Sequence, residues 1–158
     1  MIQDTHQLAK RFREVILDGT WVANTNFKDQ LYGMSLEMAT AKVGNLNTIA
    51  VLAQHIHYYI AGLNTVFSHG TLGISDKYSF DFPPMESQQQ WDNFLDRLWS
   101  DAEKFASAVE QMLPEKLSEP FVYEQYGSYL RNIDCMIEHS YYHLGQVVII
   151  KKLLQKGI

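Results

Sequence analysis

The sequence has almost no cysteine, no long apolar run and no basic cluster, and each absence excludes a class of protein. Cys135 is the only cysteine, so no internal disulfide can form, and a reducing, cytoplasmic location is expected. The longest unbroken apolar run near the C-terminus spans residues 147–150, far short of the roughly 20 residues that cross a membrane. Residues 1–19 mix acidic and basic side chains, unlike a signal peptide.

The charge balance argues against a nucleic-acid partner. Lys and Arg number 13 against 18 Asp and Glu, and the formal net charge is -5, whereas nucleic-acid binders present a basic face. The rest of the composition is ordinary for a globular protein, with 46% hydrophobic and 20% charged residues. This composition and the length of 158 residues predict one domain covering 1–158 that can bury a core.

Four segments carry apolar residues at three- and four-residue steps, which predicts four helices and no strand pair. Each segment follows a residue whose side chain can cap the helix by accepting a free backbone N–H. These caps are Asp4 or Thr5, Asn45 or Asn47, Ser87, and Ser128. Ser87 and Gln90 also form a capping-box pattern. Gly19 suits the left-handed residue just past the first helix, and His69-Gly70 ends the second.

The connections between these helices are long. Residues 20–46 include Trp21 and a short helix expected after Ser35, and we expect this stretch to pack over the rest of the molecule. Residues 71–86 are typical of an ordered crossover loop, and the first and third connections (the latter 115–126) are long enough to cross the molecule. Amphipathic helices can bury their apolar faces only against one another. The sequence therefore predicts an all-α four-helix bundle with long crossover connections.

The fourth predicted helix carries the first chemical signal. His139 and His143 are four residues apart, so they project from one face about one turn from each other, close enough to chelate one ion. At about 100° per residue, they lie on the flank of the apolar stripe. Arg131, Glu138 and Lys152 mark the solvent side. Both imidazoles are therefore expected in a partly buried position.

The second predicted helix offers a third ligand. His55 and His57 point about 200° apart and cannot serve the same site. His55 falls near Leu52 and Tyr59 on the apolar side, so it is the better candidate. Three imidazoles with open coordination positions are typical of a catalytic site for zinc or a similar ion, not of a closed structural site.

Simpler interpretations stay open. Two histidines at this spacing are common by chance, and His55 alone on an apolar face is typical of a hydrogen-bonded core residue. Cys135, one turn before His139, is either a fourth ligand or a small buried thiol, and the buried thiol is favoured. Glu138 points about 100° away from His139 and is interpreted as solvated rather than as a general base. Surface or loop roles are assigned to the remaining histidines: His6, His57 and His69. Four tyrosines are interpreted as packing groups, any one of which could reach the site with its hydroxyl: Tyr58, Tyr59, Tyr141 and Tyr142.

Sharper motifs are missing. Residues 139–143 enclose Ser-Tyr-Tyr without a glutamate, which excludes the HExxH zincin signature. Neither histidine has a Glu three residues before it, which excludes the ferritin-like di-iron pattern. Glycine-rich phosphate loops and serine-hydrolase elbows do not occur either.

Two stretches together resemble the DinB-like metalloenzyme family. The first runs from Asn47-Thr48-Ile49 to Gln54-His55-Ile56, and the second is the His-x-x-x-His-x-Gly-Gln run within Ile137–Gln146. The resemblance covers essentially the whole chain. It implies a bundle with crossover connections, a divalent metal site at His55, His139 and His143, and a homodimer. Members of that family include thiol S-transferases and a thiol-dependent maleylpyruvate isomerase, although many have no known activity.

The resulting expectation is a protein that binds one divalent ion, with zinc or nickel favoured over manganese and iron, and that transfers a low-molecular-weight thiol to a small-molecule electrophile. A metal-dependent hydrolase, a non-catalytic metal- or ligand-binding stress protein, and a bundle with purely structural histidines are the alternatives. The long segments around Trp21 and residues 80–82 are expected to shape the mouth of the pocket. No catalytic residue beyond the three ligands is assigned.

Overall fold

The computed structural model describes residues 4–157, and in that range it is helical with no strand. Six α-helices occur in this range: α1 (Thr5–Arg13), α2 (Phe27–Leu31), α3 (Leu36–Thr40), α4 (Ile49–His69), α5 (Gln88–Glu110) and α6 (Tyr129–Gln155). Four short non-α turns join them: the π-helical turn Glu14–Asp18, and 3-10 turns at Asp76–Tyr78, Pro114–Ser118 and Glu124–Tyr126. Within residues 4–157, no helix combines the length and the apolar character needed to cross a membrane.

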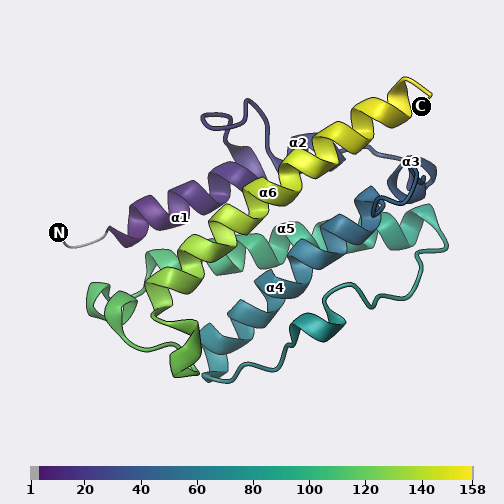
Figure 1. Cartoon of the computed structure of the whole chain (residues 1–158). Coiled ribbons are helices and arrows are strands. Elements are labelled where there is room, and N and C mark those ends of the chain that lie inside the picture. Colours follow the sequence, from purple (N-terminus) through teal and green to yellow (C-terminus); the bar gives the residue numbers. More distant parts are fainter. Residues whose placement is uncertain (1–3, 158) are drawn as a thin grey trace.

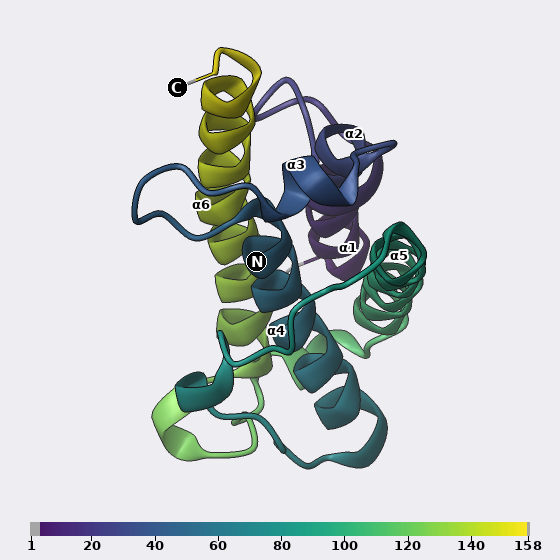
Figure 2. The same ribbon diagram turned by 90° about the vertical axis from the view of Figure 1, so that its right-hand side faces the viewer.

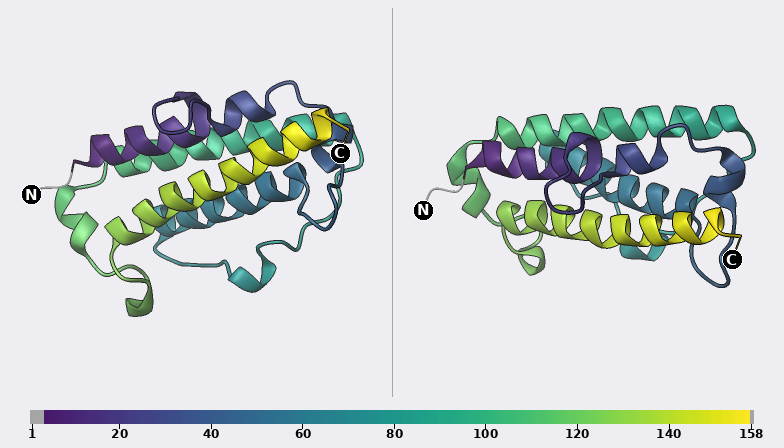
Figure 3. Two further views of the ribbon diagram at one scale, coloured as in Figure 1. Left: turned by 45° about the horizontal axis from the view of Figure 1, so that its top comes forward. Right: turned by 90° about the horizontal axis from the view of Figure 1, so that it is seen from above.

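The long helices form a helical bundle. Helix α1 packs against α5, α5 against α4, α4 against α6, and α6 against α1, so the contacts close a ring. Figure 2 shows the four helices around a common interior. In Figures 1 and 3, α1 and α6 run one way along the bundle, and α4 and α5 run the other way. The predicted all-helical bundle is thus confirmed at the level of its architecture.

One of the three connections, residues 71–87, runs the length of the bundle, from the end of α4 to the start of α5 (Figure 1). The first connection carries α2 and α3 instead, and the third stays at the end where α5 stops and α6 starts. The first and third connections were predicted to be long enough to cross the bundle, but neither of them crosses it. Phe27 and Leu31 of α2 are fully buried, because this short helix packs against the π-helical turn Glu14–Asp18 and against α6.

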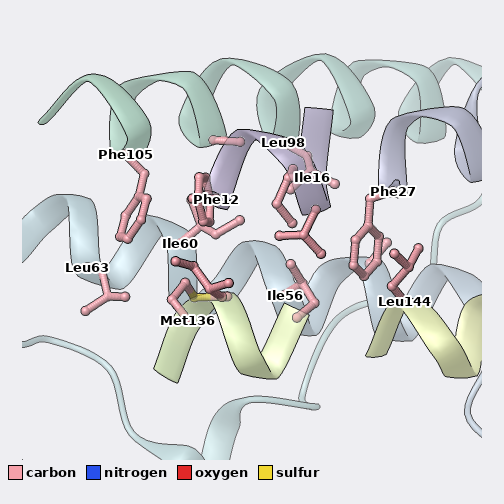
Figure 4. Packing of buried hydrophobic residues seen from close by; sticks show 14 of the residues in the cluster. Phe12, Ile16, Phe27, Ile56, Ile60, Leu63, Leu98, Phe105, Met136 and Leu144 are labelled. Carbon is pink, nitrogen blue, oxygen red and sulfur yellow. The ribbon is translucent and has the colours of Figure 1, made fainter. Parts of the chain in front are cut away.

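The core is aromatic and aliphatic throughout. The rings of Phe12 on α1 and Phe105 on α5 lie 4.3 Å apart between centroids, and Figure 4 shows them among side chains from every long helix. Trp91 is fully buried and donates its indole N–H to the Met34 carbonyl at 3.0 Å. This bond ties the connection that carries α3 to the start of α5, so the indole is buried without an unpaired polar atom.

Several predicted helix ends are correct. Asp4 caps α1, Ser87 caps α5, Ser128 caps α6, and Gly70 ends α4 in the left-handed conformation at φ 71°. Ser35 caps the expected short helix α3. In the capping box the glutamine at position 90 accepts from the backbone N–H of residue 86 rather than from that of residue 87.

Two predicted ends are wrong. Helix α4 is capped by Thr48, whose hydroxyl accepts from the Val51 N–H at 3.2 Å, and not by Asn45 or Asn47. Gly19 is extended, with φ -101° and ψ 162°, so it is not a left-handed cap. The π-helical turn before it closes so tightly that a Cβ atom at position 19 would overlap the side chain of Glu14. Glycine is needed there for close approach, not for a positive φ.

Candidate metal centre

The three predicted ligands meet in the interior between α4 and α6. His55 comes from the N-terminal half of α4, and His139 and His143 come from successive turns of α6. One ring nitrogen from each lies within 4.8 Å of the others. His55 is only 3% exposed and His143 is 6% exposed, while His139 is half-buried. The burial follows from the packing of α4 on α6, which sequesters the flanks predicted to carry these side chains.

Hydrogen bonds fix the orientation of two of the rings. The Nδ1 of His55 is 2.8 Å from the Ser79 carbonyl oxygen, and the Nδ1 of His143 is 2.6 Å from Oε1 of Gln146. A carbonyl oxygen can only accept, so both Nδ1 atoms carry the proton and both Nε2 atoms keep a free lone pair. In metal-binding histidines, the ring nitrogen that does not bind the metal typically donates its N–H to such an acceptor, which fixes the tautomer.

The environment keeps the three imidazoles neutral. Burial, together with the neighbouring His143 and His55, lowers the pKa of His139 from 6.5 to about 4. Burial likewise lowers the pKa of His55 and the pKa of His143 below the ordinary value. Neutral imidazole is the form that coordinates a metal ion, so the three side chains have the charge state of metal ligands at neutral pH.

The spacing of the nitrogens fits a small divalent ion. The Nε2 atoms of His55 and His139 are 3.0 Å apart. Two imidazole nitrogens bound to zinc at 2.0–2.1 Å in a tetrahedral arrangement are separated by about 3.3 Å. Three neutral imidazoles whose ligand nitrogens all lie within 4.8 Å of one another could hold a divalent ion, with positions left open for other ligands. The structure thus brings together the three residues that the sequence predicts as metal ligands.

Aromatic rings surround the triad. Phe80 stacks on the ring of His55, with centroids 3.9 Å apart and planes 10° apart. Tyr59 lies 5.1 Å from His55 and 5.2 Å from His139 between ring centroids. The Tyr59 hydroxyl donates to the Asp76 carboxylate at 2.9 Å. The crossover connection thus covers His55 with Phe80. The pocket beside His139 is lined by residues 72–76 of this connection rather than by 80–82. Trp21 is 88% exposed and lines a separate pocket.

The other histidines lie elsewhere. His57 points away from the triad, and its Nε2 is 2.8 Å from the Asp101 carboxylate on α5. It is half-buried between two helices, so the expected surface or loop role is wrong for this residue. His6 lies near Glu110 and is exposed, and His69 is exposed at the last residue of α4, as expected.

Neither Cys135 nor Glu138 joins the triad. Cys135 is not part of the cluster that the described residues form, and burial raises the pKa of its thiol, so it stays a neutral, partly buried thiol. It lines a pocket beside His139 instead. Glu138 is solvent-exposed and lies 3.3 Å from Arg131, which confirms that it faces away from the site.

Comparisons of the chain with models of protein families, with curated proteins and with solved structures find no match.

Sequence reasoning missed two residues of the site, Ser79 and Asp76. Both come from the crossover connection, and the Ser79 carbonyl reaches a histidine 24 positions earlier in the chain. A backbone carbonyl leaves no trace in residue type, and Asp76 is one of several acidic residues in the chain. The aromatic residues at 80–82 were the only local signal that this connection approaches the site.

Proposed function

We propose that this chain is a metal-dependent enzyme of the DinB-like kind, in which His55, His139 and His143 hold one zinc or nickel ion and a low-molecular-weight thiol is transferred to an electrophile. The observation that supports it best is the convergence of three neutral imidazole nitrogens from two helices, all within 4.8 Å of one another, beside a pocket that His139 also lines. A structural role for the histidines would require neither the convergence nor the pocket.

The chemistry divides between the ion and the chain. A divalent ion at such a site lowers the pKa of a coordinated thiol or water and so supplies a nucleophile at neutral pH. The chain supplies an oriented set of ligands: the Ser79 carbonyl and Gln146 hold two of the rings. The adjoining pocket of about 340 Å³ would hold the second reactant in place, which reduces the entropic part of the barrier.

Asp76 favours a second candidate function, a metal-dependent hydrolase. A hydrolase needs a general base to take a proton from water, and the sequence indicates none. In the structure, the Asp76 carboxylate is hydrogen-bonded to Tyr59 and lines the same pocket as His139. An exposed carboxylate beside the pocket is a proton acceptor for either nucleophile, so this observation supports hydrolysis without excluding thiol transfer.

The test is a His143→Ala variant assayed beside wild type for bound metal and for turnover of thiol-transfer and ester substrates. We expect loss of both metal and turnover. His69→Ala, which removes an exposed histidine at the end of α4, is the matched control. If His143→Ala retains its metal and its activity, the proposal is wrong. Metal binding without any turnover supports the non-catalytic binding protein instead. The homodimer and the cytoplasmic location stay predictions.

A further inference from the structure

The pocket beside the triad has a predominantly apolar wall. It has a volume of about 340 Å³ and lies between α4, α6 and the two connections that follow α4 and α5. That volume is at the small end of the range for small-molecule sites, roughly 300–1,000 Å³. His139 belongs both to this wall and to the triad. Five aliphatic, aromatic or thioether side chains line it: Leu63, Leu72, Ile74, Phe121 and Met136.

The wall of the pocket carries one charged side chain, and it is acidic. Among the pocket-lining residues within 4–157, Asp76 is the only one with a formal charge at neutral pH, and no lysine or arginine occurs. The remaining polar groups are neutral: hydroxyls of Tyr59, Ser75 and Tyr126, an amide, a thiol and the imidazole of His139. Proteins bind carboxylate and phosphate groups with arginine or lysine side chains or with clustered backbone N–H groups. The side chains of this pocket offer a carboxylate or a phosphate no cationic partner.

We propose that the pocket binds the apolar body of an uncharged or cationic organic substrate and discriminates against anionic ones. The inference rests on the proposed function, since it takes the reacting atom of the substrate to lie at the triad next to His139. The aliphatic wall would bury the body of the molecule. An ion at the triad would bind the sulfur of every thiol alike, so the discrimination falls on the other end of the molecule, where Asp76 would attract a cationic group and repel an anionic one.

This polarity narrows the choice of reactants. Thiols that carry one or more carboxylates would place an anionic group against an apolar, acidic wall, so they are poor occupants of this pocket. A neutral or amine-bearing thiol, or a neutral electrophile with an apolar body, is a good one. The substrate class is therefore set by the absence of a basic side chain as much as by the apolar surface.

The inference is tested with cobalt-loaded protein and three benzyl thiols that differ only in the para substituent: methyl, aminomethyl or carboxylate. Binding is read from the change in the cobalt absorption spectrum, so no turnover is needed. We expect the neutral and cationic thiols to bind at least about tenfold more tightly than the anionic one, because the acidic wall repels the carboxylate. Equal affinities for all three thiols would overturn the inference.

Two variants test the residues. Asp76→Asn keeps a hydrogen-bond acceptor for Tyr59 but removes the charge. We expect it to reduce the difference in affinity between the cationic and the anionic thiol. Glu138→Gln removes an exposed charge on the far side of α6 and is the matched control. Cys135→Phe places a ring in the pocket, so it weakens binding of the benzyl thiols. It leaves azide, a small anion that needs only the metal, bound as in wild type.

The outcomes separate the two proposals. Failure to take up cobalt would contradict the metal site and, with it, the proposed function. Uptake of cobalt and a normal response to azide, without discrimination among the thiols or an effect of Cys135→Phe, would contradict the pocket assignment alone. If Cys135→Phe does not fold, the affinities of the three thiols for the wild-type protein still test the pocket assignment.

Discussion

The Nε2 atoms of His55 and His139 face each other across the α4–α6 interface at 3.0 Å, although the two residues are 84 positions apart in the chain. His55 donates its Nδ1 proton to the Ser79 carbonyl, so its Nε2 can only accept. Without a metal ion, His139 donates a proton across this contact. Coordination would require the other tautomer of His139, in which the proton is on Nδ1, the imidazole stays neutral and both Nε2 lone pairs are available. The contact therefore holds the two rings in a ligating arrangement before any ion arrives.

Gln146 is predicted to tune metal affinity without contacting the metal. Its Oε1 atom accepts from Nδ1 of His143 at 2.6 Å, which fixes that ring. Replacing Gln146 with leucine removes the acceptor and leaves the ring free to turn. Loss of such a partner typically weakens metal binding by about 10- to 100-fold. Competition with a chromophoric chelator measures the affinity, and we expect a decrease in this range.

The control for this variant is Gln155→Leu, the same substitution at the exposed last residue of α6. We expect wild-type affinity, because position 155 is three turns beyond the triad. Equal affinities for both variants and wild type would show that His143 needs no orienting partner.

Stability of the metal-free protein is predicted to rise with pH through the range in which histidines titrate. Burial and the other two histidines lower the pKa of His139 from 6.5 to about 4 in the folded state. In the unfolded chain this pKa returns to its ordinary value of about 6.5. Between these values the unfolded chain binds more protons, so the free energy of unfolding increases from pH 4 to pH 6.5 and then levels off.

Urea unfolding of wild type and of His139→Gln at a series of pH values from about 4.5 to 7.5 measures this effect. Carboxylates titrate in the same way in both proteins, so the difference between them isolates the histidine. We expect the rise in the free energy of unfolding with pH to be smaller in the variant. Parallel curves would mean that His139 has an ordinary pKa.

Gly62 is predicted to be essential for seating the crossover connection on α4. A Cβ atom at this position would overlap the side chain of Ile74, so Gly62→Ala must displace Ile74 and the segment that carries Asp76 and Ser79. Overpacking of this kind costs about 1–3 kcal/mol. Chemical unfolding measures the loss, and we expect metal affinity to fall with it. Adding Ile74→Ala to Gly62→Ala should restore most of the metal affinity, because the clash is gone.

Gly145 supplies the matched glycine control. It is exposed within α6, and a Cβ atom there would meet nothing within 4 Å. Gly145→Ala is therefore expected to stabilise the protein by about 0.5–1 kcal/mol, since alanine favours the helix. If Gly62→Ala stabilises the protein as much as Gly145→Ala does, the close packing at position 62 is not what holds the connection in place.

The parts of the fold that sequence could predict are those determined locally. The long helices follow from apolar spacing, and the choice of His55 over His57 follows from helical geometry alone. Helix α2 escaped prediction because its five residues are too few to show a period; α3 is equally short and was expected only from Ser35 before it. Only the core packing reveals why Phe27 and Leu31 are apolar. The cap of α4 was misplaced because Asn45, Asn47 and Thr48 are all good caps.

In the site, too, the locally determined features could be predicted and the long-range contacts could not. The pairing of His139 with His143 is a helical repeat and was predictable, and the flank they occupy indicated their burial. Ser79, Asp76 and the stacked ring of Phe80 reach the site through the path of a connection, and no local pattern specifies that path. The charge of the pocket wall, which sets the proposed substrate class, depends on these long-range contacts.

The central claim is most directly tested by elemental analysis of untagged protein purified without chelators. The comparison uses a His139→Ala/His143→Ala double variant and His57→Ala as a matched control, with helix content checked by circular dichroism. About one divalent ion per chain in wild type and in His57→Ala, and none in the double variant, is the predicted result. Absence of metal from all three, with no uptake on dialysis against zinc or nickel, would contradict the account and leave the three histidines as polar residues of the core.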